Sequence, residues 1–350
     1  MASGRSVPGS QRPAAINWYD AWRSAAVGPV GFWHHERPAT HFRTASSGTG
    51  LVARMVLALL ADWPDISTVV DIGAGDGRLL AEIGALAPRM RLIGLDLRPQ
   101  PAGRSDSAAG SAQSAPIWLR GCWDADAAAW RPGRAGAAPV PLRTVLPLDE
   151  PMVILATEWL DDLPLVVAER IADGWREVQV RPDGAESPGA PVPDADADWL
   201  DRWWPGRPGS RAESGRTRDR AWTELIGCLG AGGLAVMIDY GHRRSERPIG
   251  GTLTGFQHGR QVRPRPSPSI NLTAHVAVDA VQRAGEAAGA WTELFVSQRD
   301  AVERLLPISP GTDRSQDGPL ARLQAAGERR LLADTLGSQW WLVQSVRPKR

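Results

Sequence analysis

The stretch of residues 67–96 constrains the fold of this 350-residue chain more than any other part of the sequence. Residues 67–72 are mostly apolar and predict a buried strand, and a glycine-rich turn follows at 73–77. Residues 78–87 have the spacing of an amphipathic helix, and residues 91–95 predict a second strand. A strand, a turn, a helix and a strand in this order predict a βαβ unit, which implies a parallel sheet with right-handed crossovers.

The glycine turn predicts a nucleotide-binding site. Gly73, Gly75 and Gly77 allow positive φ angles and let a ligand approach the backbone closely. The helix that follows directs its free N–H groups and its positive dipole end toward that ligand. Asp96 comes at the end of the second strand, where an acid can accept hydrogen bonds from both ribose hydroxyls. We therefore interpret these four residues as cofactor-binding.

The spacing of the acid and the glycines favours S-adenosylmethionine (SAM) over other nucleotides. The pattern Asp71-x-Gly73-x-Gly75-x-Gly77 is typical of SAM methyltransferases, whereas NAD-binding proteins have GxGxxG. Asp71 suits SAM because a carboxylate at the strand end can bind the free amino group of SAM directly or through water. The sequence contains no GK[ST] run, which excludes a Walker A loop. An NAD-binding turn and a structural turn without a ligand are the alternatives.

Two acids, Asp124 and Asp126, follow a weak third strand at 117–119. An acid in this place can bind the adenine amino group, so Asp124 is a candidate for cofactor binding. Acids that start a helix in a polar loop explain the same residues equally well.

The crevice beside the glycine turn is predicted to receive a second group of polar residues. Glu158 and Asp161 follow the apolar strand 152–156, and the carboxyl end of a central parallel strand faces the ligand crevice. Such carboxylates can bind a guanidinium or an ammonium group, or they can cap a helix. Asp239 and Tyr240 end the next central strand and project into the same crevice, where they are candidates for substrate binding.

Composition and charge narrow the function classes. The 40 basic and 39 acidic side chains leave a net charge of +1, which argues against a protein that holds nucleic acid or an anionic membrane by bulk charge. The six histidines lack the spacing of metal ligands and there is no CxxC, so we expect no metal site and no disulfide scaffold. The sequence has no apolar run of membrane-spanning length and no secretory signal near its start, so we expect a cytoplasmic protein without membrane insertion. Its 16 tryptophans and single lysine are typical of GC-rich, bacterial coding.

The remaining sequence predicts one domain with long irregular connections. Residues 1–15 are expected to form a disordered tail, and 16–350 a single domain with its core at 47–346. Further helices are predicted at 47–63, 221–229, 274–288 and 320–336, and further strands at 166–171, 175–180, 234–238, 294–296 and 340–346. Segments rich in glycine, proline, serine and aspartate are interpreted as loops or disorder: 98–116, 131–149, 181–195, 205–218 and 243–270.

Eight short segments, in the right order, resemble motifs of the MidA family of SAM-dependent methyltransferases. The resemblance runs from about Ile16 to Val346. The segments, each with the family motif that it matches, are 28–33 (PGxGYY), 41–46 (GDFxTSP), 71–77 (ExGxGxG), 157–164 (NExxDAxP), 174–177 (GWxE), 239–241 (DYG), 251–256 (GTLRGY) and 271–276 (DLTAHV). Departures from these motifs include Thr157, which replaces asparagine, Asn271, which replaces aspartate, and His41, which stands where the family has an aspartate.

The resemblance implies a class I methyltransferase fold, which is a Rossmann-like, mostly parallel α/β sheet with helices on both faces. It implies that the last strand, near Trp340, is antiparallel to its neighbours. An N-terminal helical segment and an irregular insertion at about 243–290 would cover the crevice. The resemblance also implies SAM as the cofactor.

The MidA family includes a mitochondrial complex I assembly factor with protein-arginine methyltransferase activity, so the resemblance implies methyl transfer to an arginine nitrogen of a protein substrate. Glu158 would then hold and polarise the guanidinium, and Asp161 or His275 would take the released proton. A binding or assembly protein without catalysis, a small-molecule methyltransferase and an NAD-dependent oxidoreductase are the alternatives. The arginines at 243–265 favour a solvated loop over a docking surface for an acidic partner.

Overall fold

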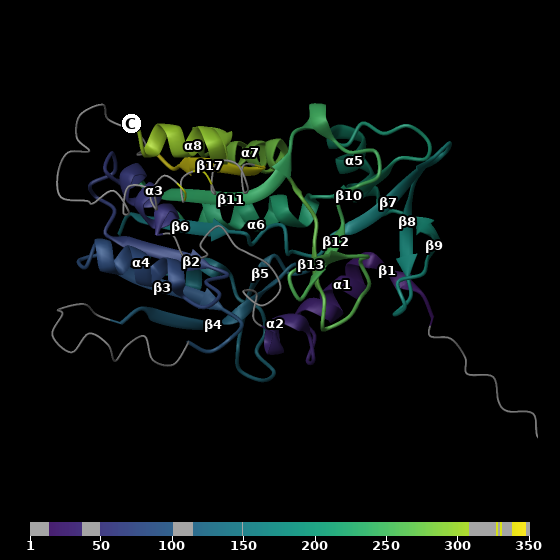
Figure 1. Cartoon of the computed structure of the whole chain (residues 1–350), viewed down its shortest axis with the longest axis horizontal. Helices are drawn as coiled ribbons and strands as arrows, with labels where there is room; N and C mark the ends of the chain where they lie inside the picture. The colour runs from purple at the N-terminus through teal and green to yellow at the C-terminus, as the bar shows by residue number, and fades with distance from the viewer. Residues whose placement is uncertain are drawn as a thin grey trace, which may run out of the picture.

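A nine-stranded sheet forms the centre of the protein (Figure 1). We analysed a computed structural model that describes residues 14–36, 50–100, 115–148, 150–307, 327, 330 and 338–347. The strands follow one another across the sheet in the order β16 (Trp291–Ser297), β17 (Gln339–Ser345), β11 (Leu234–His242), β6 (Met152–Thr157), β2 (Thr68–Ile72), β3 (Arg91–Asp96), β4 (Ile117–Asp124) and β5 (Ala129–Pro132), with β15 (Val276–Ala277) beside β11.

Strands β11, β6, β2, β3 and β4 are parallel, as the βαβ unit predicts. Strand β17 lies antiparallel between β11 and β16, which confirms the expectation for the last strand near Trp340. All residues of β2 are buried, including the polar Thr68 and Asp71, because a central parallel strand is covered on both faces. The carboxyl ends of the parallel strands consequently meet along one edge of the sheet.

Helices cover both faces of this sheet. One face carries α3 (Leu51–Leu60), α4 (Arg78–Leu86) and α8 (Gln298–Leu305), and the other carries α6 (Arg216–Gly227) and α7 (Val278–Ala287). Leu80 and Ile83 of α4 pack with Val69 and Leu155 of the sheet on the first face. On the second face the buried Trp222 of α6 donates a hydrogen bond of 2.7 Å from its indole nitrogen to the side chain of Gln344.

Two smaller sheets lie in the right-hand half of the view in Figure 1. The strands predicted at 166–171 and 175–180 are present as β7 (Val166–Ile171) and β8 (Gly174–Val180), which pair antiparallel. The five-stranded sheet contains β1 (Ile16–Asn17), β8 (Gly174–Val180), β7 (Val166–Ile171) and β10 (Arg211–Ser214), with β9 (Glu186–Pro191) beside β8. The three-stranded sheet contains β13 (Arg260–Val262), β12 (Thr254–Gln257) and β14 (Asn271–Thr273). The remaining helices are α1 (Trp18–Val27), α2 (Phe32–His35) and α5 (Asp194–Trp203).

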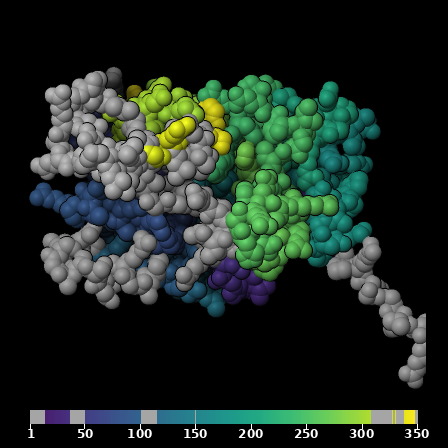
Figure 2. Space-filling view, viewed as in Figure 1, coloured from purple at the N-terminus to yellow at the C-terminus, as the bar shows by residue number. Residues whose placement is uncertain are grey.

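Helix α1 is held by its tryptophans. Trp18 and Trp22 are fully buried and pack with Val167 and Val178 of the five-stranded sheet and with Leu272 of β14. Figure 2 shows the consequence on the surface, where the N-terminal helices lie directly beside the lobe that contains β12 and β13. The N-terminal segment and the three-stranded sheet therefore form one continuous wall.

Several segments that we expected to be irregular contain regular structure. Segment 181–195 contains β9, segment 205–218 contains β10, and segment 243–270 contains β12 and β13, so the insertion at 243–290 is not irregular. These strands form because distant residues pair, such as Thr254 with Thr273, and this pairing outweighs their weak local propensity. Strand β4 is also longer than the expected 117–119, because β5 pairs with its second half.

Other boundaries shift by a few residues. Helix α7 begins at Val278 rather than at 274, because Val276 and Ala277 pair with β11 as the short strand β15. Helix α6 begins at Arg216, ahead of the expected 221. Outside the described residues lie the expected helix at 320–336 except for residues 327 and 330, nearly all of the tail at 1–15, most of the loop at 98–116 and the motif at 41–46. None of the described helices is long and apolar enough to cross a membrane.

Candidate active site

A cavity of about 440 Å³ lies at the carboxyl ends of β2, β3, β4 and β6, and we call it the first cavity. Its volume is in the range of small-molecule binding sites. The residues that line it come from the glycine turn, from the ends of β3, β4 and β6, and from α1. A parallel sheet provides this position because several strand ends and the loops after them converge there.

The glycine turn has the backbone that a close-fitting cradle needs. The φ angles of Gly73, Gly75 and Gly77 are +72°, +61° and +69°, a region that favours glycine. Space is short as well, since a Cβ atom on Gly73 would lie 2.6 Å from the ring of Trp159. The N–H of Gly73 donates to the carbonyl of Leu95 at 2.9 Å, which ties the turn to the end of β3.

Asp71 lies beneath the turn rather than in the wall of the first cavity. Its side chain is buried, and within the described part of the chain no hydrogen bond reaches its carboxyl group. Burial, with smaller contributions from the charges of Asp96 and Asp76, raises the pKa of Asp71 to about 8. A bound ammonium group would favour the ionised carboxylate, so the residue fits the amino group of SAM best through a water molecule.

Asp96 lines the first cavity and joins the turn to the segment after β3. One carboxylate oxygen accepts the N–H of Gly75 at 2.8 Å, and the other accepts the backbone N–H and the Nε of Arg98 at 2.8 and 3.2 Å. A carboxylate can accept about four hydrogen bonds, so these three contacts leave room for one ligand hydroxyl.

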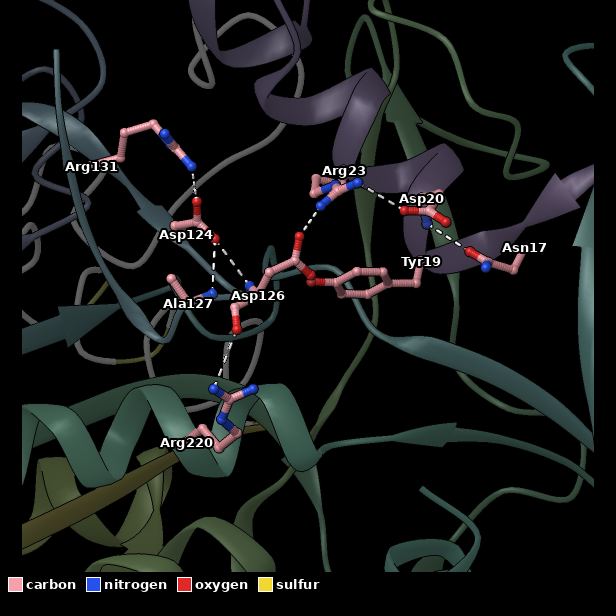
Figure 3. A network of polar contacts seen from close by, with 9 residues as sticks. All are labelled: Asn17, Tyr19, Asp20, Arg23, Asp124, Asp126, Ala127, Arg131 and Arg220. Atoms are coloured by element: carbon pink, nitrogen blue, oxygen red, sulfur yellow. Dashed lines mark hydrogen bonds and ion pairs between the residues drawn. The ribbon is translucent and has the colours of Figure 1, made fainter. Parts of the chain in front are cut away.

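Asp124 also lines the first cavity, but its carboxylate serves its own loop (Figure 3). One oxygen accepts the backbone N–H groups of Asp126 and Ala127 at 3.1 and 3.0 Å, and the other pairs with Arg131. Partial burial alone would raise the pKa of Asp124, but the hydrogen bonds from Ala127 and Arg131 outweigh it and lower the pKa. This geometry is that of a turn cap, and its three contacts leave room for about one N–H group of a ligand.

Asp126 anchors α1 over the first cavity (Figure 3). Its carboxylate accepts hydrogen bonds from the hydroxyl of Tyr19 and from Arg23. Arg23 also donates to Asp20 at 2.9 Å, and Arg220 of α6 donates to the carbonyl of Asp126 at 3.3 Å. The sequence predicted an N-terminal cover for the crevice but not these polar contacts.

A second cavity of about 870 Å³ adjoins the first. Glu158 and Asp162 line both cavities, so the two spaces meet at the segment that follows β6. The predicted residues Asp161, Tyr240 and His275 line only the second cavity. The opposite wall comes from residues of 251–264 and 271–273.

Glu158 is held in an unusual backbone conformation. Its φ angle is +48°, which a non-glycine residue adopts at a cost of about 1–3 kcal/mol. The N–H of Glu158 donates to the carbonyl of Ile238 at 2.8 Å, and the side-chain amide of Gln339 in β17 donates to its carboxylate. Strained backbone of this kind is typical of functional sites, and it places the Glu158 side chain where the cavities meet.

Asp161 and Asp239 form a buried pair of carboxyl groups. A hydrogen bond joins the two groups, and burial raises the pKa of Asp161 and raises that of Asp239 further. Asp239 also accepts the N–H groups of Leu160 and Asp161 at 3.1 and 3.3 Å. Asp239 is not among the residues that line the second cavity, so its role is to position the turn that carries Asp161.

Tyr240 and His275 stack on each other in the second cavity, with ring centroids 6.0 Å apart and planes at 22°. Burial, aided by the positive charge of Arg218, lowers the pKa of His275, so its ring is neutral at pH 7. Burial and the nearby charge of Glu158 raise the pKa of Tyr240. Both rings therefore present uncharged surfaces to a bound group.

Two buried charged residues that sequence reasoning missed shape the second cavity. Arg218 is 1% exposed and donates to the carbonyls of Asp161, Leu163, Ala274 and His275 at 2.7, 3.2, 2.8 and 3.0 Å. Glu213 is 2% exposed and accepts hydrogen bonds from Thr252 and Leu253 in the opposite wall. Neither residue lies in a recognisable motif, so the sequence carried no signal for them.

Comparison with solved structures identifies the class of fold. A protein of the COG1565 superfamily from Burkholderia thailandensis, bound to S-adenosyl-homocysteine, is 20% identical; the alignment covers 95% of this chain and 88% of that chain, with a TM-score of 0.70. A native structure of a protein of the same superfamily and organism is 21% identical, with coverages of 95% and 87% and a TM-score of 0.69. The fold is that of a class I SAM-dependent methyltransferase, as the sequence predicted.

The sequence itself points to a particular family within this class. Residues 126–296 match the family described as "Putative S-adenosyl-L-methionine-dependent methyltransferase". The match confirms the resemblance to the MidA motifs, the predicted class of enzyme and its methyl donor. Comparison with curated protein sequences gives no match.

Proposed function

We propose that this methyltransferase binds SAM in the first cavity and transfers its methyl group to an arginine nitrogen of a protein that enters the second cavity. The observation that carries the proposal is that Glu158 and Asp162 line both cavities. A methyl donor on one side and a nucleophile on the other would then meet at these two carboxylates.

The first cavity fits SAM by shape and by charge. Its volume of about 440 Å³ suits a nucleoside with an amino-acid tail. Asp96 has acceptor capacity for a ribose hydroxyl, and the buried Asp71 beneath the turn would stabilise a positively charged amino group. The S-adenosyl-homocysteine in the related Burkholderia thailandensis protein supports the same cofactor here.

The second cavity fits a cationic acceptor. Glu158, Asp161 and Asp162 supply three carboxyl groups, and Tyr240 and His275 supply a stacked aromatic wall. A guanidinium group can form paired hydrogen bonds with a carboxylate and can stack on aromatic rings, which suits both features. The volume of about 870 Å³ and the wall at 251–264 also leave room for the chain on either side of an arginine.

When bound, SAM supplies an electrophilic methyl group. The residues of this chain contribute position and charge, because displacement at carbon requires the nitrogen to lie in line with the bond that breaks. Glu158, fixed by Ile238 and Gln339, would hold the guanidinium and increase the electron density on its nitrogen. The acceptor must also lose a proton, so a base is needed at the junction of the cavities.

The direct test uses SAM labelled in its methyl group, synthetic peptides that each carry one arginine, and free L-arginine. We expect label in peptides, at the arginine side chain, as mass spectrometry would locate it. Label only in free arginine would instead identify a small-molecule methyltransferase. SAM binding by calorimetry without any labelled product would identify a protein that binds SAM but does not catalyse transfer, and binding of NAD in place of SAM would overturn the assignment of the first cavity.

The role of Glu158 has its own test. Glu158→Gln keeps the shape of the side chain but removes the charge that holds the guanidinium, so we expect loss of methylation with SAM affinity within twofold of the original. Glu303→Gln is the matched control, because Glu303 is exposed on α8, on a helix that does not line either cavity. Unchanged turnover in Glu158→Gln would remove Glu158 from the reaction.

A further inference from the structure

Asp162 differs from the other acids at the junction of the cavities. It lines both cavities, whereas the neighbouring Asp161 lines only the second. Asp162 is half-buried, while Asp161 is 6% exposed. A substrate in either cavity can therefore approach the Asp162 carboxylate, and this access is what a residue in direct contact with the reacting atoms requires.

A neutral side chain holds Asp162 in place. The amide nitrogen of Asn271, a residue of β14 that is 3% exposed, donates to a carboxylate oxygen of Asp162 at 3.2 Å. The other two acids have different partners: Asp161 shares a hydrogen bond with Asp239, and Glu158 accepts one from Gln339. An amide donor orients a carboxylate without adding a positive charge that would weaken its basicity.

The contact joins two positions at which the chain departs from the motifs that it resembles. The NExxDAxP motif has alanine where Asp162 stands, and the DLTAHV motif has aspartate where Asn271 stands. This pair of positions therefore has one carboxylate in the motifs and one in this chain. In this chain the carboxylate belongs to Asp162, which lines both cavities, and the amide belongs to Asn271.

A separate observation indicates that a cationic group belongs beside these acids. Asp161 lines the second cavity and is more than nine-tenths buried, yet its Oδ1 atom has no hydrogen-bond partner among the described residues. A buried carboxylate oxygen without a partner is costly, and a donor from a bound guanidinium would remove that cost.

We propose, on the basis of the function proposed above, that Asp162 is a catalytic residue that removes the proton from the acceptor nitrogen, and that Asn271 is its positioning residue. The nitrogen attacks the methyl carbon of SAM, so that a nitrogen–carbon bond forms while the sulfur–carbon bond breaks, and the sulfur leaves with the bonding electrons as S-adenosyl-homocysteine. The proton of the guanidinium passes to the Asp162 carboxylate, and the methylated guanidinium keeps its single positive charge.

The surroundings of Asp162 suit a base that works near neutral pH. Burial and the negative charges of Asp161 and Glu158 raise its pKa, while the hydrogen bond from Asn271 and the charge of Arg218 in α6 partly offset this rise. Tyr240 of β11 and His275, which face the same cavity, are uncharged at pH 7. A base of this kind works best when its pKa lies near the operating pH.

The first test is Asp162→Asn, measured with labelled SAM and the single-arginine peptide that the original protein methylates fastest. We expect kcat to fall by about 100-fold or more, in the range of a lost general base, while the Kd for SAM stays within twofold. The remaining activity is expected to lose the acidic limb of the pH profile. The variant should fold, because asparagine has the shape of aspartate without a charge to bury. A kcat within threefold of the original, with the same pH profile, would overturn the proposal.

The second test moves the carboxylate across the contact. Asp162→Ala alone is expected to lose activity. The double variant, Asp162→Ala with Asn271→Asp, is expected to be at least tenfold more active than Asp162→Ala alone. Failure to recover in a double variant that melts at the temperature of the single variant would overturn the pairing of these residues. If no single-arginine peptide is methylated by the original protein, the proposed function fails and this proposal with it. If the original protein methylates a peptide and Asp162→Asn has the same kcat and pH profile, only the role of Asp162 is refuted.

Discussion

Glu213 is predicted to hold one wall of the second cavity, and Glu213→Gln tests this directly. The buried carboxylate accepts the N–H of Thr252 at 2.9 and 3.1 Å with its two oxygens, the Thr252 hydroxyl at 3.1 Å and the N–H of Leu253 at 3.3 Å. The Thr252 hydroxyl oxygen in turn accepts the N–H of His275 at 2.9 Å. One carboxylate therefore connects β10 to two segments that line the second cavity.

The expected loss of stability of this wall follows from the number of donors that lose a charged acceptor. Hydrogen bonds to charged groups contribute about 1.5–3 kcal/mol and neutral ones about 0.5–1.5 kcal/mol, so each of the three donor groups loses about 1 kcal/mol. The neutral glutamine is easier to bury, which offsets part of this loss. We expect the wall at Thr252 and Leu253 to be destabilised by about 2 kcal/mol, which is a factor of about 30 in its opening equilibrium.

Hydrogen exchange reports this opening residue by residue. The amides of Thr252 and Leu253 should exchange about 30-fold faster in Glu213→Gln, while those of the glycine turn at 73–77 keep their rates. The KM for an arginine peptide should rise and the Kd for SAM should stay unchanged, because the wall borders only the second cavity. Glu169→Gln, an exposed position on β7, is the matched control. Unchanged exchange at Thr252 and Leu253 would refute the reasoning.

Three other predictions concern buried or bridging groups. The folded protein keeps the Asp71 proton up to about pH 8, whereas the unfolded chain releases it near pH 4, so this group costs up to about 1.4 kcal/mol of stability per pH unit between those values. Asp71→Asn should therefore gain stability over the original as pH rises from 5 to 8 in denaturant titrations, and parallel pH curves would contradict this. In Arg218→Lys the lysine cannot reach all four carbonyls, so the free energy of unfolding should fall by about 1–3 kcal/mol, which would appear as a lower melting temperature. Arg54→Lys, at an exposed position on α3, should melt like the original. Asp126→Asn should weaken the contacts that hold α1 and raise the Kd for SAM about fivefold in calorimetry. An unchanged Kd would show that the position of α1 does not affect SAM binding.

Local pattern was sufficient for the centre of the fold. Strands such as β2 and β6 are mostly apolar because helices cover both sides of the sheet, so their burial is visible in the sequence. The glycine turn was equally visible, because positive φ angles in a short space require glycine. The strands β9, β10 and β12 were not visible, since each exists through pairing with residues far along the chain.

The candidate site also contains features that were visible in the sequence and features that were not. The sequence placed Glu158, Asp161, Asp239 and Tyr240 at the ends of central strands, and the structure brings all four to one edge of the sheet. It did not distinguish Asp239, whose carboxyl group bonds to the backbone, from Glu158, which faces both cavities. Residue type and strand position specify which acids reach the edge, but the direction of each side chain depends on packing.

The amino-acid sequence alone therefore determined the parallel sheet and the glycine turn and favoured SAM as the cofactor, because these depend on short-range patterns of apolar residues, glycines and acids. Only the tertiary structure decided that two cavities meet at Glu158 and Asp162. It also decided that Asn271 contacts Asp162 and that Arg218 and Glu213 support the walls. These contacts join segments 39 to 109 residues apart, and no local pattern encodes them because the partners come together only when the sheets and helices pack.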